Sequence, residues 1–202
     1  MPLITSPKTA TQLPRASAGF TLVEILITVV VLSIGLLGLA GLQISGLRAN
    51  MSSEARSKAT LLANDIIERM RANPLGVDAN QYAGITTASL DCDTDPSPFC
   101  SNTSSADAEN CTATEMATFD AWVWACGLPV AAGVQRGGIQ NFLLDGAARV
   151  TCTDNDASDA DACSPGSSHT VTVSWSENSP NTTETTSAGS SQTQTISLVV
   201  VP

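Results

Sequence analysis

Six residues, Gly19-Phe20-Thr21-Leu22-Val23-Glu24, begin the part of the chain that decides its fold. They stand at the head of an apolar run, and the 18 residues from Ile25 to Leu42 contain no charged side chain and no proline. As a helix this run is about 27 Å long, close to the ~30 Å hydrocarbon core of a bilayer. We therefore predict a transmembrane helix over Ile25 to Leu42.

Glu24 lies just inside this membrane-length segment. A charged side chain at the middle of a transmembrane helix costs about 2.5 to 3.5 kcal/mol on insertion scales, so such a residue is by default a functional-site hypothesis. No cation within the apolar run can neutralise the carboxylate. The sequence therefore predicts that Glu24 meets a partner outside its own anchor.

Two ordinary interpretations of the segment are a secretory signal peptide and a simple single-pass anchor. In a signal peptide the small-residue cleavage site follows the apolar stretch, whereas Ala16-Ser17-Ala18-Gly19 precedes it here. The run is also too long for the apolar region of a signal peptide. A simple anchor does not explain why a carboxylate follows the glycine by five residues.

The stretch from Gly19 to Glu24 resembles the class III signal of type IV pilins and of type II secretion pseudopilins. The resemblance implies that a prepilin peptidase, which is also the N-methyltransferase, cleaves after Gly19 and that the new amino terminus, Phe20, is N-methylated. It also implies that Glu24 meets the amino-terminal charge of a neighbouring subunit during filament assembly. A charge in an apolar filament core is costly unless it is paired, so this contact supplies the missing partner.

The charges outside the anchor predict its orientation. Residues 1–19, the expected leader, carry Lys8 and Arg15 and no acid, and by the positive-inside bias this end stays in the cytoplasm. The chain has 9 basic and 19 acidic residues, so removal of the leader gives 7 minus 19, a net charge of −12. Such an acidic surface argues against non-specific nucleic-acid binding. We expect one pass through the inner membrane, with the globular domain in the periplasm.

The helix is expected to continue beyond the membrane, from about Phe20 to Ala72, as one element ~80 Å long. One face of its second half is apolar at steps of three and four residues and needs a sheet to cover it: Met51, Ala55, Ala59, Leu62, Ile66 and Met70. The opposite face is polar: Arg48, Ser52, Arg56, Asn64 and Arg71. Asn73-Pro74 is predicted to end the helix, because the residue before a proline disfavours helical geometry.

Three glycines, Gly35, Gly38 and Gly41, lie in the apolar half of this helix. Small residues allow close helix packing in lipid, but each interior glycine also costs about 0.8 to 1 kcal/mol relative to alanine. By resemblance, this part of the helix is often unwound in assembled pili, and major pilins commonly have a proline where this chain has Gly41. Packing and flexibility therefore both stay open, and the glycine argues against a major pilin.

Six cysteines, all after the anchor, suit an oxidising compartment and predict disulfides: Cys92, Cys100, Cys111, Cys126, Cys152 and Cys163. No Cys-x-x-Cys pair occurs, and the single histidine, His169, is not close to a cysteine pair of ligand spacing, so no zinc or other metal site is expected. Six cysteines allow 15 pairings, which sequence alone does not resolve. Short loops favour pairing between neighbours: Cys92 with Cys100, Cys111 with Cys126, and Cys152 with Cys163.

The segment that follows the long helix changes in character. Residues 86–118 are rich in Thr, Ser, Asp and Asn, which predicts a cross-linked loop. Glu115 to Cys126 carries apolar side chains at helical spacing and predicts a short helix that stops before Pro129. A strand at Trp122-Val123-Trp124 is the alternative.

Strand signals occupy the rest of the chain. Asp145-Gly146 is a two-residue turn signal between Ile139 to Leu144 and Ala147 to Cys152, which are predicted to pair as a hairpin. Alternating apolar residues mark a half-buried strand: Val171, Val173 and Trp175. A last strand over Thr195 to Val201 is predicted to pair with it across the polar loop 177–193.

Together these elements predict an α+β fold, in which a long N-terminal helix packs on a C-terminal antiparallel sheet; by resemblance this is the type IV pilin fold. The leader is assigned to residues 1–19 and the transmembrane and assembly half of the helix to residues 20–45. The amphipathic half of the helix covers residues 46–73, and a disulfide-containing globular domain covers residues 74–202.

Catalysis and metal binding have little support. Aspartates alternate in two loops without the central glycine or the twelfth-position glutamate of an EF-hand: Asp91, Asp93 and Asp95, then Asp154 with Asp156 and Asp159 with Asp161. Solvated loops are the preferred interpretation, with calcium binding as the minor alternative. No Gly-x-Ser-x-Gly elbow, His-Glu-x-x-His helix or phosphate-binding glycine loop occurs. We therefore expect no enzyme activity and no cofactor, and interpret His169 as an ordinary residue at a strand edge.

Residues 33–43 and 63–74 resemble PilV-type minor pilins, also called type IV pilus modification proteins. The resemblance implies a minor pilin that takes part in initiating type IV pilus assembly or its tip complex, supporting pilus biogenesis and twitching motility. The implied partners are prepilin peptidase, other minor and major pilins and the inner-membrane assembly platform, and the implied destination is the cell-surface pilus. The alternatives are a type II secretion minor pseudopilin and an adhesin-like tip pilin that contacts a surface through loops 86–118 or 177–193.

Overall fold

The computed structural model describes residues 19–102, 108–131, 134–156, 158, 160–179 and 190–202. The chain divides into two compact units, of which the first ends at Arg48 and the second comprises Ala49–Pro202. The expected leader lies outside the described residues, apart from Gly19.

The long helix is present as one element, α1 (Leu22–Ala72), which begins two residues later than predicted and ends where predicted. Asn73 directly follows the end of α1 and is the N-cap of the next, short helix α2 (Pro74–Asp78). Its side chain accepts a hydrogen bond from the Gly76 N–H at 3.3 Å. Pro74 occupies the first turn of α2, where a missing N–H costs nothing because that N–H would have no helical partner. The chain therefore stops one helix and starts another within two residues.

The second half of α1 supplies one side of the main core. Most of the predicted apolar face is buried or partly buried, but Met51 is 69% exposed, so its assignment to the face was wrong. The core begins about one turn later, at Ala55, because no described part of the chain covers Met51. Ser52, predicted on the polar face, is instead half-buried and donates to a carboxylate oxygen of Glu177 at 3.0 Å.

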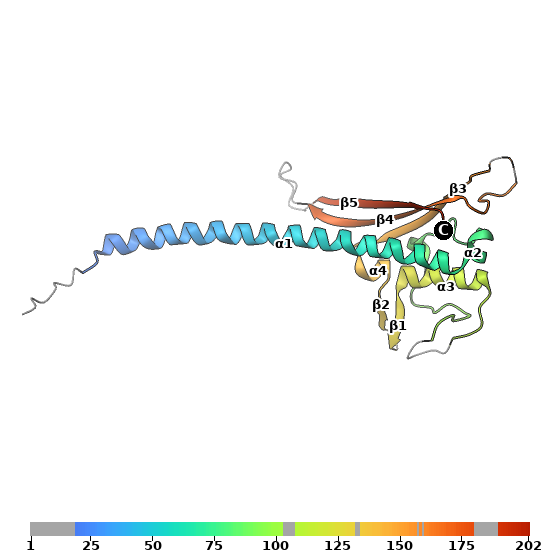
Figure 1. The fold of residues 1–202 in the computed structure, drawn as a ribbon. Coiled ribbons are helices and arrows are strands. Elements are labelled where there is room, and N and C mark those ends of the chain that lie inside the picture. Colours follow the sequence, from blue (N-terminus) through green and yellow to red (C-terminus); the bar gives the residue numbers. More distant parts are fainter. Residues whose placement is uncertain (1–18, 103–107, 132–133, 157, 159, 180–189) are drawn as a thin grey trace, which may run out of the picture. The chain divides into compact units, whose positions relative to one another are not determined.

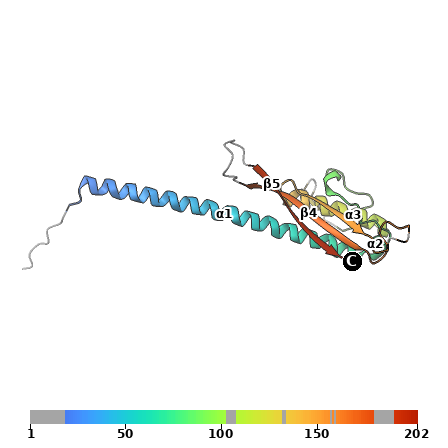
Figure 2. The same ribbon diagram turned by 90° about the horizontal axis from the view of Figure 1, so that it is seen from above.

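An antiparallel sheet confirms the predicted α+β class. Its three strands are β3 (Ala147–Thr153), β4 (Ser168–Ser179) and β5 (Ser190–Val200), in the order β3-β4-β5. The predicted alternation on β4 is present, since Val171, Val173 and Trp175 are buried and contribute to the core. Figure 1 shows β4 and β5 alongside the second half of α1, and Figure 2 shows the same strands from above.

The second predicted helix is α3 (Ala113–Cys126), so the alternative strand at Trp122 to Trp124 was wrong. A capping box begins it: Thr112 accepts from the Glu115 N–H, and the Glu115 carboxylate accepts from the Thr112 N–H at 2.8 Å. These hydrogen bonds lower the pKa of Glu115, with the Thr112 N–H as the largest cause. A small sheet that the sequence did not predict follows, formed by β1 (Leu128–Ala131) and β2 (Val134–Arg136).

The predicted hairpin around Asp145-Gly146 was wrong. The first of its two strands is instead a helical turn, α4 (Ile139–Phe142), and β3 pairs with β4, from Ala147↔Ser174 to Thr153↔Ser168. The Gly146 N–H donates to the Leu143 carbonyl at 3.1 Å, which folds the turn back onto α4 rather than between two strands. The predicted loop 86–118 was too long, because α3 already begins at Ala113; the described residues of this segment before α3 contain one short 3-10 helix, η1 (Thr87–Ser89), and no other helix or strand.

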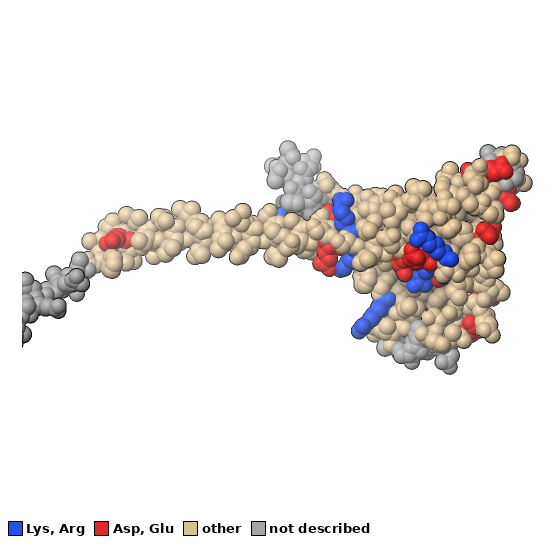
Figure 3. Space-filling model, in the orientation of Figure 1, with Lys and Arg blue, Asp and Glu red and all other residues tan. Residues whose placement is uncertain are grey.

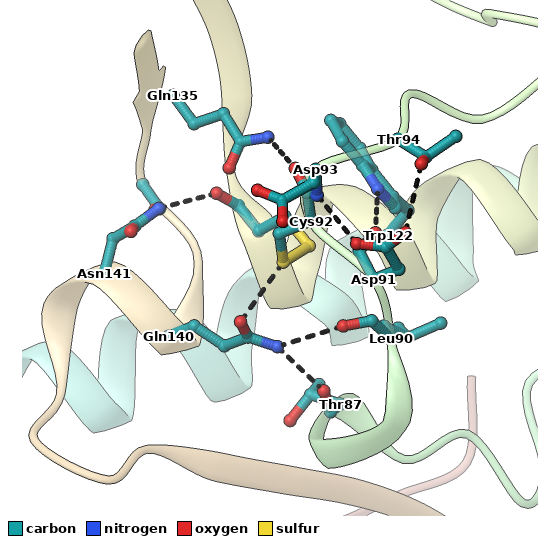
Figure 4. The surroundings of a disulfide bond; sticks show 12 residues. Thr87, Leu90, Asp91, Cys92, Asp93, Thr94, Trp122, Gln135, Gln140 and Asn141 are labelled. Carbon is teal, nitrogen blue, oxygen red and sulfur yellow. Dashed lines mark hydrogen bonds between the residues drawn. A yellow bond between two sulfur atoms is a disulfide. The ribbon is translucent and has the colours of Figure 1, made fainter. Parts of the chain in front are cut away.

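All six cysteines form disulfides, but with a different pairing from the one favoured by loop length. The Cys152–Cys163 bond was predicted correctly, whereas Cys92 pairs with Cys126 and Cys100 pairs with Cys111. The Cys92–Cys126 bond ties the loop to the end of α3. Figure 4 shows its surroundings, where the Gln135 side chain donates to the Cys92 carbonyl at 2.7 Å and the Trp122 indole donates to the Asp91 carbonyl at 3.0 Å.

Candidate functional site

The predicted cleavage junction precedes α1 in a part of the chain with no regular structure. Gly19 and Phe20 are both exposed, and the Phe20 side chain is 77% exposed. A peptidase needs an extended, accessible backbone, which a helix does not offer because its N–H and C=O groups are already paired. The Gly19–Phe20 bond has the accessibility that cleavage requires.

The first turn of α1 is capped by Thr21. Its hydroxyl accepts a hydrogen bond from the Glu24 N–H at 3.2 Å, and its carbonyl accepts from the Ile25 N–H at 3.3 Å. An N-cap of this kind satisfies one of the free N–H groups at a helix start. Glu24 thus lies in the first turn, where the helix dipole favours a negative charge.

The anchor segment satisfies its own polar groups, with one exception. Residues 22–42 contain three polar side chains, Glu24, Thr28 and Ser33. Thr28 donates to the Ile25 carbonyl at 2.8 Å, and Ser33 donates to the Val29 carbonyl at 2.7 Å. The Glu24 carboxylate makes no hydrogen bond and no ion pair with any residue that the structure describes. In lipid an unpaired polar group costs several kcal/mol, so Glu24 is the one side chain of the anchor that still needs a partner.

Within the described residues, α1 is the one helix long and apolar enough to cross a membrane, with a mean hydropathy of 2.7 over its most apolar 18-residue window. Every residue from Gly19 to Met51 is exposed. The helix continues through Gly35, Gly38 and Gly41, and an added Cβ at any of them meets no atom within 4 Å. This apolar surface needs a cover of lipid or of other helices.

A second polar site joins the end of α1 to α3 inside the globular unit. Arg69 donates to Asp120 at 3.0 Å, and the Tyr82 hydroxyl donates to the other oxygen of that carboxylate at 2.6 Å. The Asn73 side chain donates to the Tyr82 hydroxyl at 3.1 Å and to the Ala113 carbonyl at 2.8 Å. Through Arg69 and Asn73, these contacts give the charged and polar residues of segment 63–74 partners inside the globular unit.

The electrostatics of this network favour a neutral, protonated Tyr82 and a charged Arg69. Burial, followed by the contact with Asp120, raises the pKa of Tyr82, so the phenol stays protonated and acts as a donor. Burial alone lowers the pKa of Arg69, but the carboxylates of Asp65 and Asp120 outweigh burial and raise it. Beside the network, the Trp124 indole donates to the Leu62 carbonyl at 2.8 Å, which fixes α3 against α1.

His169 lies on β4, the central strand, and is buried, so the expectation of a strand-edge position was wrong. Its Nε2 lies 3.6 Å from the Cys163 sulfur, and the ligand atoms of Cys152, Cys163 and His169 lie within 4.8 Å of one another. Because the two sulfurs are bonded to each other, neither is a thiolate that could bind a metal. Burial lowers the pKa of His169, although the Ser167 carbonyl partly opposes the shift.

The acidic loops use their carboxylates as local acceptors. Asp91 accepts from the Asp93 N–H at 2.9 Å, and Asp154 accepts from the Ser164 N–H and the Ser167 hydroxyl, both at 3.0 Å. The hydrogen bond from Ser164 is the main reason that the pKa of Asp154 is lowered. Asp159 lies outside the described residues.

One surface hollow of about 280 Å³ lies between the second half of α1, the end of α3 and the turn before α4. Its charged lining residues are Lys58, Asp65, Arg69 and Arg136. None of its lining residues is a serine, threonine, cysteine or histidine.

Two comparisons bear on the N-terminal half of the chain. Residues 14–40 match the prokaryotic N-terminal methylation motif, and residues 41–122 match the family model described as type IV pilin Tt1218. These residues resemble a type IV pilin. The long N-terminal helix and C-terminal antiparallel sheet agree with the type IV pilin fold.

The two pilin matches together cover both candidate sites. The methylation motif includes Gly19, Phe20 and Glu24, while the pilin model includes Arg69 and Asp120. The matches and the apolar helix indicate a pilus-related pilin that is anchored in a membrane. No curated protein and no solved structure matches the chain.

The polar network in the globular unit was missed from the sequence, although two signals mark it. Asp120 is the one acid inside the largely buried part of α3, where a charged residue needs a partner. Tyr82 is the single tyrosine of the chain. Nothing in the sequence shows that Tyr82 and Arg69 both meet Asp120, because the two contacts span 38 and 51 positions.

Proposed function

We propose that this chain is a PilV-type minor pilin that prepilin peptidase processes at Gly19 and that helps to initiate type IV pilus assembly or to form its tip complex. The observation that carries this proposal is the Glu24 carboxylate, which has no partner among the described residues although it lies in the first turn of a membrane-length helix. The matches to the methylation motif and to the pilin model support the same reading.

Cleavage after Gly19 creates the cation that the carboxylate lacks. The new amino group on Phe20 lies at the start of the mature chain, four residues before Glu24. Subunits stacked with a small axial offset bring the amino group of one subunit to the carboxylate of the next. In an apolar environment both charges are costly alone, so pairing them favours the assembled state.

The exposed apolar surface of α1 supports the choice of partners. From Gly19 to Met51 this surface needs a cover, which is lipid before assembly and the helices of other minor and major pilins afterwards. Such contacts join different surfaces of successive subunits, which generates an open helical array. The proposal places residues 1–19 in the cytoplasm as a leader, residues 20–45 in the inner membrane next to the assembly platform, and the domain 74–202 in the periplasm. It includes a contribution to twitching motility.

The first test addresses processing. We expect mass spectrometry of the wild-type protein from producing cells to find an N-methylated Phe20 at the amino terminus, and Gly19→Val to retain the 19-residue leader. A wild-type chain that keeps residues 1–19 contradicts the proposal.

The second test addresses the assembly contact. We expect Glu24→Val to be cleaved and inserted normally but to be missing from sheared pili, because it lacks the carboxylate that pairs with the neighbouring amino terminus. Glu54→Gln, which removes an exposed carboxylate further along the same helix, serves as the matched control and should be incorporated like wild type. Normal incorporation of Glu24→Val overturns the proposal. Loss of protein secretion with normal pili identifies a secretion pseudopilin instead.

A further inference from the structure

The two edges of the three-stranded sheet differ. Residues 84–86 cover part of the β3 edge: the Gly84 N–H donates to the Val150 carbonyl at 2.9 Å, and the Val150 N–H donates to the Ile85 carbonyl at 3.0 Å. The β5 edge has no such cover, because β4 is the one described strand that pairs with β5. The described part of the chain thus leaves one row of backbone donors and acceptors open along β5.

The β5 strand lacks the features that normally protect a free edge. Its eleven residues contain no charge, no proline and no glycine, and its register with β4 continues from His169↔Val200 to Ser179↔Ser190 without a bulge. Proteins usually protect open edges with lysine, proline, bulges or a covering segment, because an unprotected edge pairs with other strands. β3, by comparison, has both a cover and the exposed Arg149.

The strand is also held firmly in place. Ile196, Leu198 and Val200 pack against the main core, while Thr195, Ser197 and Val199 face outward, and Val199 is 70% exposed. A one-residue slip would bring the outward residues to the core, so the burial of this face fixes the register. The open edge therefore presents its backbone donors and acceptors to a partner in one fixed register.

The backbone groups and the lack of charge along the β5 edge indicate which kind of partner can bind there. A row of backbone N–H and C=O groups is matched by another extended strand, as in β-augmentation, where main-chain hydrogen bonds supply the affinity. The chain has a net charge of −10, so two similar acidic domains approach each other most easily where charge is absent. Figure 3 shows a mostly uncharged surface over β4 and β5, with a blue group near the end of these strands beside the grey residues.

We propose that the open edge of β5 is an assembly surface, on which an extended, uncharged strand of a neighbouring pilin subunit of another kind adds to the sheet. This inference rests on the proposed pilin function and names the surface by which the globular domain contacts its neighbour. A second copy that pairs antiparallel is the less suitable partner: antiparallel pairing of two β5 strands runs residues 49–72 of their α1 helices in opposite directions, because these residues lie alongside β4 and β5 (Figure 1). Two chains anchored in one membrane do not allow that arrangement.

The experiment uses the full-length chain in producing cells, with a photo-crosslinking amino acid in place of Thr195. The edge variant Ser197→Lys/Val199→Lys places two cations beside the open edge. The control Thr172→Lys/Thr170→Lys places the same two cations on β4, at the register partners of Ser197 and Val199. Both variants remove the hydrogen bond between Thr172 and Ser197. They therefore differ only in whether the added lysines lie on β5 or on β4.

We expect a crosslinked adduct with a different pilin, identified by mass spectrometry, that the edge variant loses and the control variant keeps. Thermal melting of each detergent-solubilised chain checks that both variants fold, and Val199→Lys alone provides a milder edge variant if the double variant does not. An adduct with only a second copy, equal loss in both lysine variants, or no adduct in cells with normal pili overturns the inference. If Glu24→Val fails to assemble while the edge variant assembles and crosslinks like wild type, this inference alone is wrong. Normal assembly of Glu24→Val contradicts the pilin proposal itself.

Discussion

Arg69 on α1 and Asp120 on α3 form an ion pair with an N–O distance of 3.0 Å, in which the Asp120 side chain is 6% exposed and the Arg69 side chain 24%. Asp120 also accepts from the Tyr82 hydroxyl, so two donors converge on one buried carboxylate. A buried charge is tolerated when it is paired and hydrogen-bonded. This pair connects the end of the long helix to the disulfide-bonded part of the domain.

Asp120→Ala is therefore expected to destabilise the globular unit. The substitution leaves the Tyr82 hydroxyl without its acceptor and removes one of two carboxylates from Arg69, a loss of about 2 to 3 kcal/mol after allowance for the remaining pair with Asp65. Denaturant unfolding of the detergent-solubilised full-length chain measures it. Glu68→Ala is the control: it removes an exposed pair with Arg71 and should cost less than about 1 kcal/mol. Equal stability of the two variants contradicts the assigned role of Asp120.

The elements that the sequence predicted correctly depend on local rules. Asn73-Pro74 ends α1 because the restriction before a proline acts within two residues, and β4 follows from the alternation of Val171, Val173 and Trp175. The segment 139–144 was assigned wrongly because a short apolar run is compatible with a strand or a helical turn. Its turn signal, Asp145-Gly146, is real, since Asp145 has a positive φ of 49°, but it follows a helix.

The candidate sites divide in the same way. The N-terminal candidates Gly19, Phe20 and Glu24, whose roles stay predictions, were accessible to sequence reasoning because they are close together in the chain. The partners of Asp120 and of Cys126 were not, because each lies more than 30 residues away and is brought close only when α3 packs. Loop length favours short disulfide loops, but the position of α3 decided the pairing of Cys126.

The two disulfides whose pairing differs from the prediction should differ in their contribution to stability. In the chain-entropy model a loop of 34 residues, as closed by Cys92–Cys126, stabilises by about 4 kcal/mol, and one of 11 residues, as closed by Cys100–Cys111, by about 3 kcal/mol. Cys126 is also fully buried, so its loss disturbs packing. We expect the alanine pair at 92 and 126 to lower the melting temperature of the full chain more than the pair at 100 and 111. Peptide mapping without reduction checks the connectivity independently, and a Cys92–Cys100 peptide would contradict it.

The buried His169 predicts a pH dependence in the mildly acidic range. Burial lowers its pKa below the ordinary 6.5 in the folded state, so below pH 6.5 the unfolded chain binds the proton more readily and folding becomes less favourable. Stability should be independent of this group above pH 6.5, fall as the pH decreases below 6.5, and level off below the folded pKa. Melting temperatures between pH 5 and 8 measure the trend.

Since His169 is the one histidine of the chain, His169→Gln should flatten this slope whatever its effect on stability at pH 8. The carboxylates with lowered pKa, such as Asp154, change the pH dependence of stability only near pH 4 and below. This range is separate from the one in which His169 titrates. A wild-type stability that does not change between pH 8 and 5 contradicts the assignment.

Gly127 is expected to tolerate no side chain. Its φ is +88°, and an added Cβ lies 2.5 Å from the Arg136 carbonyl oxygen, a backbone atom that cannot move aside easily. Gly127→Ala should therefore cost about 2 to 3 kcal/mol from strain and overpacking together. Gly84→Ala isolates the strain, because Gly84 has a similar φ of +81° with no atom within 4 Å of its Cβ position. Equal losses in the two variants exclude a contribution from the close approach.

The hydroxyls of Thr28 and Ser33 both donate to carbonyls of their own helix, so these hydrogen bonds do not depend on what surrounds the helix. Transfer of this anchor from a bilayer to a bundle of other helices leaves those hydrogen bonds unchanged. Glu24 is the one polar side chain between Leu22 and Leu42 without a hydrogen-bond partner in this helix, so on the proposed function only its polar contact changes between the two surroundings. On the proposed function, the same helix can therefore leave the membrane for a filament with a single polar contact made, and return with that contact broken.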